Sequence, residues 1–375
     1  MSSPMPYLVV SASGRALAAS ARLADLSVVV LDLFNDVDTR RLAVKSERCA
    51  AARGGFSARL LLERAHALSE PDGFAGIVVG SGLEGRTRLH SQLARVGPLT
   101  GNSPECVARV KAPKSFFGML DQVGVPHPAV SVSSPQGSDG WLSKRIGGAG
   151  GSHVRPARFA ASHGNGRYFQ RLVQGTAMSV LFLADGLGTE VLGFNRLISV
   201  RLSASQPFVF AGAVSEPEPC QALLEQISGI VADLTRELSL RGVNGLDFIQ
   251  TPEGPQIIEL NPRPTASMAL HEGRSTNGLF KAHVEACAGR MPELNPPQPS
   301  RSRAMAIAWT RTSLYVPDGV AWPEWATDIP APGSIIGARR PLCTVYGEAG
   351  STGAAEQLVQ ERARTVFDQL RLVTA

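Results

Sequence analysis

Three side chains with oxygen donors lie in two strand-like segments, residues 246–250 and 256–261. If the five residues between these segments form a hairpin loop, Asp247 faces Glu259 across the two strands. Asn261 lies two residues after Glu259, so both side chains leave the same face. Opposed carboxylates repel unless a positive charge lies between them, and Mg²⁺ prefers carboxylate and amide oxygens. We therefore interpret Asp247, Glu259 and Asn261 as metal ligands, with a solvated strand face as the alternative.

An arginine follows these residues in the sequence Asn261-Pro-Arg263-Pro. The prolines restrict the backbone on both sides of the arginine. We therefore expect Arg263 to lie at a fixed position just beyond the proposed metal ligands.

A second group combines a lysine with a run of glycines. Side chains alternate along the strand-like segment 141–146, so Lys144 shares a face with Leu142 and Ile146. The glycines that follow leave backbone N–H groups available to surround an anion. No Gly-Lys dipeptide occurs in the chain, so this is not a Walker A motif. A plain flexible turn is the alternative to a phosphate loop, whose residues would be Gly147, Gly148, Gly150, Gly151 and Ser152.

Length and composition limit the class of protein. The 375 residues are 43% hydrophobic and predict two or three domains. The 37 basic and 32 acidic residues are interleaved, which argues against a nucleic-acid partner despite the net charge of +5. The apolar runs are strand-sized, so we expect no membrane span, and no secretory signal is apparent at the N-terminus. Five widely spaced cysteines predict free thiols in the cytoplasm.

The expected elements divide the chain into three regions. Residues 1–104 alternate strand-like and helix-like segments, which predicts a doubly wound parallel sheet. Within them, residues 80–85 match G-x-G-x-x-G, but after a late strand and without the usual acidic residue, so we expect only a glycine turn. Residues 105–291 contain an entry helix near 114–123 and a helix over 221–241 capped by Gly242. A proline-rich connection then leads to a small closing subdomain at 304–375.

In their order and spacing, these segments resemble the ATP-grasp superfamily. The resemblance extends over roughly residues 105–290, and the twelve-residue interval from Asp247 to Glu259 with the E-x-N-x-R ending is its specific part. It implies an ATP-grasp fold of mixed α/β and α+β class, with a glycine-loop lid over about 125–185. The C-terminal segment is similar to the closing piece of biotin-carboxylase-related ligases. Members of that subgroup accompany tetrahydromethanopterin and methanofuran one-carbon pathways.

The resemblance implies a role for each matching residue. Lys144 would hold the α/β-phosphates of ATP, the glycine loop would close over the β/γ-phosphates, and Lys114 would also reach ATP. Asp247, Glu259 and Asn261 would bind Mg²⁺ or Mn²⁺, and Arg263 would stabilise the transferred phosphoryl group. The strand that binds adenine would be Gln170, Arg171, Leu172 and Val173. The chain departs from the family pattern here, because Gln170 replaces a frequent glutamate and Ala177 a polar ribose contact.

The implied reaction is ATP-dependent ligation of a small-molecule carboxylate to an amine through an acyl phosphate, with glutamate or another amino acid as the expected amine. His271 and Arg274 are candidate contacts for the acid, and His153 for phosphate. A carboxylase that uses bicarbonate, a regulatory protein that binds nucleotide without turnover, and a nucleic-acid-binding protein are the alternatives. A homodimer is expected from the family alone.

Overall fold

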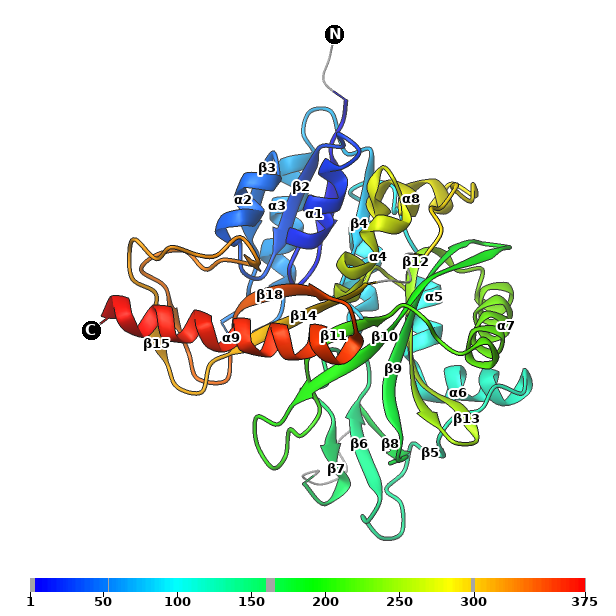
Figure 1. Cartoon of the computed structure of the whole chain (residues 1–375). Coiled ribbons are helices and arrows are strands. Elements are labelled where there is room, and N and C mark those ends of the chain that lie inside the picture. The colour runs from blue at the N-terminus through cyan, green and yellow to red at the C-terminus, as the bar shows by residue number, and fades with distance from the viewer. Residues whose placement is uncertain (1–3, 53, 160–165, 298–300, 375) are drawn as a thin grey trace.

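The computed structural model describes residues 4–52, 54–159, 166–297 and 301–374. A small parallel sheet, a four-stranded lid sheet and a large antiparallel sheet follow one another along the chain (Figure 1). Among the described residues, no helix is both long and apolar enough to cross a membrane.

The N-terminal region is a parallel sheet with the strand order β3-β2-β1-β4. One face, which includes Val9 and Val30, packs against α1 and α8, and the other, which includes Leu8 and Ile77, packs against α3 and α4. Helices on both faces confirm the predicted doubly wound arrangement. The elements are β1 (Tyr7–Val10), α1 (Arg15–Arg22), β2 (Val28–Asp32), α2 (Val37–Leu42), β3 (Lys45–Arg48), α3 (Ala58–Ser69), β4 (Gly76–Val79) and α4 (Thr87–Leu93), with α8 (Gly278–Cys287) contributed from later in the chain.

Two helices connect this region to the lid, which projects below the rest of the molecule in Figure 1. The lid strands are all antiparallel, in the order β5-β8-β6-β7. The connecting helices are α5 (Pro104–Lys111) and α6 (Pro113–Gln122), and the lid consists of β5 (Val130–Ser131), β6 (Trp141–Arg145), β7 (Arg155–Pro156), the 3₁₀ turn η1 (Ala157–Phe159) and β8 (Arg167–Arg171).

The large sheet has eight strands in the order β13-β12-β9-β10-β11-β14-β18-β16. Since β14 pairs directly with β11, the C-terminal residues extend the same sheet. Its strands are β9 (Thr176–Asp185), β10 (Thr189–Val200), β11 (Val209–Glu216), β12 (Arg241–Thr251), β13 (Gly254–Asn261), β14 (Ser302–Trp309), β16 (Ala326–Thr327) and β18 (Pro341–Ala349). The remaining elements are α7 (Gln221–Leu238), the 3₁₀ segment η2 (Ala266–Arg274), the pair β15 (Leu314–Tyr315) and β17 (Ile335–Ile336), and α9 (Thr352–Thr374).

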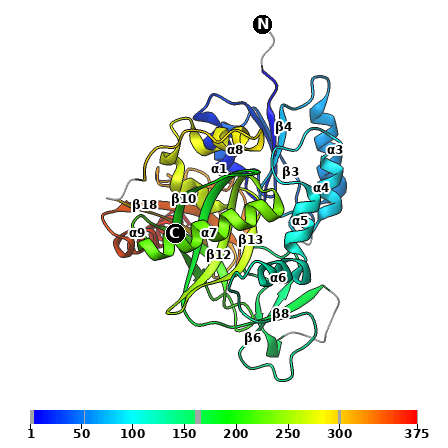
Figure 2. The same cartoon turned by 90° about the vertical axis from the view of Figure 1, so that its right-hand side faces the viewer.

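Amphipathic helices cover this sheet. The apolar stripe of α7, which includes Ile227, Val231 and Leu234, is buried in one cluster with Val180 and Phe248 of the sheet. Figure 2 shows α7 lying across the sheet near β12 and β13. At the C-terminal end, α9 packs on β14 and β18.

The end of α7 differs from the sequence prediction. The helix stops at Leu238, where Ser239 takes the left-handed conformation with φ 50°. Gly242, the expected cap, already belongs to β12, and a Cβ there would lie 2.3 Å from His283 Nδ1. This glycine is therefore needed for a close approach within the core, which periodicity along one helix does not reveal.

Candidate active site

The hairpin of β12 and β13 brings the predicted metal ligands together. Asp247 pairs with Glu259, as expected, and Gly245 pairs with Asn261. The expected five-residue loop is wrong, because Thr251 already pairs with Gly254. A register shift after Asp247, where the next pair is Phe248 with Ile257, offsets the shorter turn. This β-bulge, which the sequence did not reveal, restores the pairing that places the two carboxylates opposite each other.

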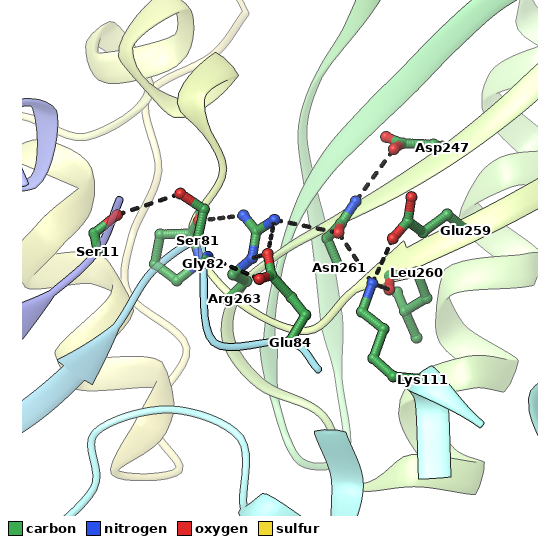
Figure 3. A network of polar contacts seen from close by, with 11 residues as sticks. Ser11, Ser81, Gly82, Glu84, Lys111, Asp247, Glu259, Leu260, Asn261 and Arg263 are labelled. Atoms are coloured by element: carbon green, nitrogen blue, oxygen red, sulfur yellow. Dashed lines mark hydrogen bonds and ion pairs between the residues drawn. The ribbon is translucent and has the colours of Figure 1, made fainter. Parts of the chain in front are cut away.

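A lysine that sequence reasoning missed lies between two of these ligands. Lys111, the last residue of α5, donates from Nζ to Glu259 Oε1 at 2.6 Å and to Asn261 Oδ1 at 3.2 Å (Figure 3). It also donates to the Leu260 carbonyl at 2.9 Å. Its ammonium group therefore supplies part of the positive charge that we had assigned to a metal alone.

The two carboxylates differ in their electrostatic surroundings. Burial and the charge of Glu259 raise the pKa of Asp247 to about 7. Burial opposes the ionisation of Glu259 as well, but Lys111 outweighs it and lowers the pKa of that carboxyl group. Asp247 accepts a single described side-chain hydrogen bond, from Asn261 Nδ2 at 3.2 Å. A further cation beside Asp247 would lower this raised pKa and favour the ionised carboxylate.

Lys144 lies on β6 of the lid and is buried. Burial lowers the pKa of Lys144, whereas the negative charges of Glu259 and Asp247 act to raise it. Lys144 therefore lies close enough to both carboxylates to interact with them electrostatically. His153, after the glycine loop, has its pKa lowered to about 4 by burial, which outweighs the attraction of Glu259. The imidazole is therefore neutral at physiological pH.

Arg263 connects the predicted metal ligands to the N-terminal region. Its Nε donates to Glu84 Oε1 at 2.6 Å, and a terminal nitrogen donates to Asn261 Oδ1 at 3.4 Å (Figure 3). Burial opposes the ionisation of Glu84, but the charges of Arg263 and Lys111 lower its pKa overall. Glu84 lies in the G-x-G-x-x-G turn that sequence analysis set aside. The position of that turn at the carboxyl edge of a parallel sheet was the signal for a site residue there.

The glycine loop is held between two regions of the molecule. A Cβ at Gly147 would lie 2.2 Å from Gly85 Cα, and one at Gly151 would lie 1.9 Å from the Phe208 carbonyl oxygen. Gly150 accepts a hydrogen bond from Phe210 N, and Gln206 donates to the Ser152 carbonyl. Within the described residues, no hydrogen bond is donated by the amides of Gly147, Ala149, Gly150 and Gly151. These amides are suited to binding an anion.

A cleft lies beside these groups. Glu259, Lys111 and His153 line it together with Gly147 and Gly148 of the loop. The aromatic side chains of Phe116, Phe117 and Tyr168 form a second part of the lining. The cleft therefore combines a charged part with an apolar part, as a nucleotide requires.

The four predicted adenine-binding residues follow Tyr168 and do not line this cleft, and β8 ends at Arg171, so Leu172 and Val173 lie beyond the strand. Tyr168 lines the cleft, and Gln170 leaves the same face of β8 two residues later. Gln170 is 1% exposed, and its Nε2 is buried with no hydrogen-bond partner. Arg171 and Leu172 are exposed, and Val173 is partly buried. An unpartnered donor on this strand fits a ligand with acceptor nitrogens, such as adenine.

Other predicted residues lie elsewhere. Lys114, which was expected to reach ATP, is exposed on α6, and the lysine beside the carboxylates is Lys111, three residues earlier at the end of α5. His271 is buried, with its Nε2 2.9 Å from Asn195 Oδ1, and Arg274 Nη1 donates to the Leu192 carbonyl at 3.4 Å. These two residues anchor η2 and do not line the cleft.

The side chains and backbone amides at this site fit both expected ligands, Mg²⁺ and the phosphates of ATP. Two carboxylates and one amide oxygen are hard ligands, and Mg²⁺ is typically held by one or two carboxylates together with substrate phosphates. The described residues contain no group of three or more His, Cys, Asp or Glu side chains that could hold a metal. The phosphates would therefore have to complete the coordination. The glycine-loop amides and the Lys144 ammonium would be the groups that hold the phosphates.

Comparison with known proteins supports this description. Residues 115–267 match the ATP-grasp domain model. A search of curated proteins found no match to the chain.

Solved structures resemble the whole chain. An L-amino acid ligase from Bacillus licheniformis has TM-score 0.71 and 11% identity over 96% of this chain and 97% of its own. An N5-carboxyaminoimidazole ribonucleotide synthetase from Thermotoga maritima has TM-score 0.67 and 14% identity, covering 96% and 98%. The biotin carboxylase domain of a Hydrogenobacter thermophilus 2-oxoglutarate carboxylase, solved as a dimer with MgADP and bicarbonate, has TM-score 0.69 and 13% identity, covering 97% and 90%. The chain therefore has the ATP-grasp fold in a biotin-carboxylase-like arrangement.

Proposed function

We propose that this protein is an ATP-dependent, ADP-forming ligase that joins a small-molecule carboxylate to an amine. The observation that carries the proposal is the convergence of Asp247, Glu259 and Asn261 with Lys144 and Arg263 beside a cleft that the glycine loop borders. Binding of a nucleotide alone does not require an arginine that links the metal ligands to the N-terminal region.

The chain's residues act mainly by positioning and by charge. The amides of the glycine loop and the Lys144 ammonium bind the triphosphate and orient its γ-phosphorus toward the acid. An oxygen of the substrate carboxylate attacks the γ-phosphorus, and the bond to ADP breaks. The amine nitrogen then attacks the acyl carbon, inorganic phosphate leaves, and the amine loses a proton. Arg263 stabilises the negative charge that develops during phosphoryl transfer.

Asp247, Glu259 and Asn261 would hold Mg²⁺, or Mn²⁺ in its place. The metal ion would neutralise charge on the phosphate oxygens. Lys111 keeps Glu259 ionised and fixes its orientation before any ligand binds.

A bicarbonate-dependent carboxylase is the second candidate. Similar folds occur in a biotin carboxylase domain solved with bicarbonate and in a carboxyaminoimidazole ribonucleotide synthetase. ADP release that depends on bicarbonate would favour the carboxylase, and release that depends on an acid with an amine would favour the ligase.

The substrate assignments rest on the resemblance and stay predictions. We propose glutamate or another amino acid as the amine, and an acid precursor of a methanopterin or methanofuran cofactor as its partner. Screening acids and amines for stimulated ADP release tests both. A homodimer also stays a prediction, which sedimentation can check.

The substitution Glu259→Gln tests the proposal. The neutral side chain keeps the shape of glutamate and can still bond Lys111, so the fold is retained. We expect the rate of ADP release to fall by about 100-fold or more, because the metal site loses one charge. ADP release should be measured with the stimulating substrates over a range of Mg²⁺ concentrations.

The matched control is Glu253→Gln, in the turn of the same hairpin. Glu253 is exposed, and within the described residues its side chain accepts a hydrogen bond from Thr251 only. We expect this variant to keep wild-type ADP release. Full turnover by the Glu259→Gln variant would refute the metal assignment.

A further inference from the structure

The glycine turn at residues 80–85 holds a carboxylate group in a fixed position. The turn follows β4 and is bonded to the segment after β1, because Ala12 N donates to the Ser81 carbonyl at 2.7 Å. Gly82 has a φ of 103°, a conformation that favours glycine, and its amide donates to Glu84 Oε2 at 2.7 Å (Figure 3). The turn therefore fixes one oxygen of Glu84 and leaves the other for a partner outside the turn.

The second oxygen of Glu84 holds the guanidinium group of Arg263. Glu84 Oε1 accepts a hydrogen bond from Arg263 Nε at 2.6 Å and lies 2.5 Å from Nη2. The Glu84 side chain is 4% exposed and that of Arg263 12% exposed, so water competes little for this contact. Contacts between two ionised groups are short and directional, so this one fixes the plane of the guanidinium group.

Arg263 directs its other N–H groups to two further acceptors. Nη2 also donates to Asn261 Oδ1 at 3.4 Å, and Nη1 donates to the Pro264 carbonyl at 3.1 Å. A guanidinium group has five N–H hydrogens, and the contacts with Glu84, Asn261 and Pro264 account for four of them. Within the described residues, the second hydrogen of Nη1 has no acceptor, so it is available to a ligand.

The same turn also lies against the glycine loop. Gly85, the residue after Glu84, is so close to the loop that a Cβ on Gly147 would lie 2.2 Å from Gly85 Cα. Two successive residues of one turn therefore contact the two groups that we assign to the phosphates, the guanidinium of Arg263 and the glycine loop. The turn thus determines where Arg263 lies relative to the loop.

We propose that Glu84 is a positioning residue that holds the Arg263 guanidinium group toward the phosphoryl group in transfer. Glu84 acts through Arg263, because its side chain is buried and both of its oxygens are already bonded. A charged group that is misplaced contributes much less to phosphoryl transfer than one held in the productive position. The inference rests on the proposed function, because it assumes that Arg263 stabilises phosphoryl transfer.

Aluminium fluoride provides a readout that requires neither the acid nor the amine. Together with MgADP it mimics the transferred phosphoryl group, whereas MgADP alone reports on the rest of the nucleotide site. We expect Glu84→Gln to weaken the binding of aluminium fluoride to the MgADP-bound protein by about 10-fold. The affinity for MgADP should stay at the wild-type value, because neither Glu84 nor Arg263 lines the cleft. Calorimetric titration of the full-length protein measures both affinities.

A second variant separates position from charge. If the negative charge of Glu84 acted only through the electric field, its loss in Glu84→Gln would strengthen the binding of an anion. Glu84→Asp keeps the charge but draws the carboxylate back by one methylene group. The positioning role therefore predicts weaker binding of aluminium fluoride in both variants, whereas a role of the charge alone predicts wild-type affinity in Glu84→Asp.

Glu272 supplies the matched control. It also joins the N-terminal region to later elements, because its Oε2 accepts hydrogen bonds from Ser20 Oγ of α1 and from Leu279 N of α8, both at 3.0 Å. Within the described residues, its side chain bonds neither Arg263 nor a predicted metal ligand. Glu272→Gln should keep the wild-type affinities, and a merely structural effect of losing such a carboxylate would appear in this variant too.

The outcomes separate the role of Glu84 from the proposed function. Wild-type or tighter binding of aluminium fluoride in either Glu84 variant would overturn the positioning role alone, and so would an equal loss in Glu272→Gln. An equal loss of MgADP affinity in the Glu84 variants would also overturn it, because the effect would then not be specific to the phosphoryl group. A wild-type protein that binds no MgADP, or no aluminium fluoride with it, would overturn the proposed function and the positioning role together.

Discussion

At the scale of single residues, the charge balance around Glu259 is the main feature of the site. Lys111 and Lys144 compensate two carboxylates before any metal binds. The Lys111 side chain is 7% exposed and that of Glu259 29% exposed. This ion pair therefore holds Glu259 in place at low solvent exposure, where an unpaired charge is costly.

Substitution of Lys111 by methionine should destabilise the ligand-free protein by about 2 kcal/mol. Removing one partner of a buried pair usually costs more, but water still reaches Glu259. Addition of ADP with Mg²⁺ should stabilise this variant more than the wild type, since the metal replaces the lost charge. Urea denaturation with and without MgADP measures both effects.

The neighbouring lysine is the control for that measurement. Lys114 is exposed, so Lys114→Met should change the free energy of unfolding of the ligand-free protein by less than about 0.5 kcal/mol. Equal destabilisation by the two substitutions would contradict the role of Lys111.

At the scale of elements, the glycine loop is important because it contacts two other parts of the chain. It follows β6 of the lid, lies against the turn after β4 through Gly147 and Gly85, and bonds to β11 through Gly150. Three parts of the chain thus meet at one loop. Glycine is required at Gly147, because its φ of 64° and the distance to the opposite backbone exclude a Cβ.

The substitution Gly147→Ala should weaken ADP binding by about 10-fold while leaving the fold intact. A Cβ at this position would meet Gly85 Cα, which belongs to the backbone and cannot rotate away, so the loop must move off the turn. Calorimetric titration with ADP measures the loss, and circular dichroism checks the fold.

Gly137 in another lid loop provides a control that distinguishes backbone strain from loss of the contact with Gly85. It also has a positive φ, 83°, but a Cβ there would have no neighbour within 4 Å. Gly137→Ala should therefore strain the backbone without affecting ADP affinity. The same loss of affinity in both variants would mean that lid strain, and not the contact with Gly85, controls binding.

At the scale of the whole molecule, a buried acidic cluster joins the N-terminal region to the C-terminal strands. Asp38 accepts hydrogen bonds from the backbone amides of Asp328 and Ile329, both at 2.8 Å. Asp36 Oδ2 is buried without a partner. Burial, with the nearby charges of Asp328, Asp32 and Asp38, raises the pKa of Asp36 to about 8, although Arg15 opposes the shift.

This shift predicts how stability depends on pH. The unfolded chain releases the Asp36 proton near pH 4, but the folded chain keeps it up to about pH 8. Between these values the folded state binds more protons, so this residue reduces stability as pH rises. Asp36→Asn should match the wild type near pH 4 and exceed it increasingly toward pH 8, by up to about 1.4 kcal/mol per pH unit.

Urea denaturation at several pH values measures this difference. The exposed Asp72 supplies the control, since Asp72→Asn should shift stability by the same small amount at every pH. A constant difference between Asp36→Asn and the wild type across this range would contradict the raised pKa.

The sequence by itself determined the local parts of this protein. Strand alternation placed Glu259 and Asn261 on one face, helical spacing located α6 and α7, and the glycine run marked the loop after Lys144. These features depend on neighbours within a few residues, so their periodicity is visible in the chain. The resemblance added the ATP-grasp fold, which the matched domain and the solved structures confirm.

Only the tertiary structure decided which distant groups meet. Glu84 pairs with Arg263 across 179 positions, and Lys111 reaches Glu259 across 148. No spacing rule links such residues, because the packing of several elements sets their distance. The β-bulge after Asp247 and the hydrogen bonds of Asn195 arise in the same way. Burial in that packed interior also shifts the pKa values, so the electrostatics of the site exist only in the folded chain.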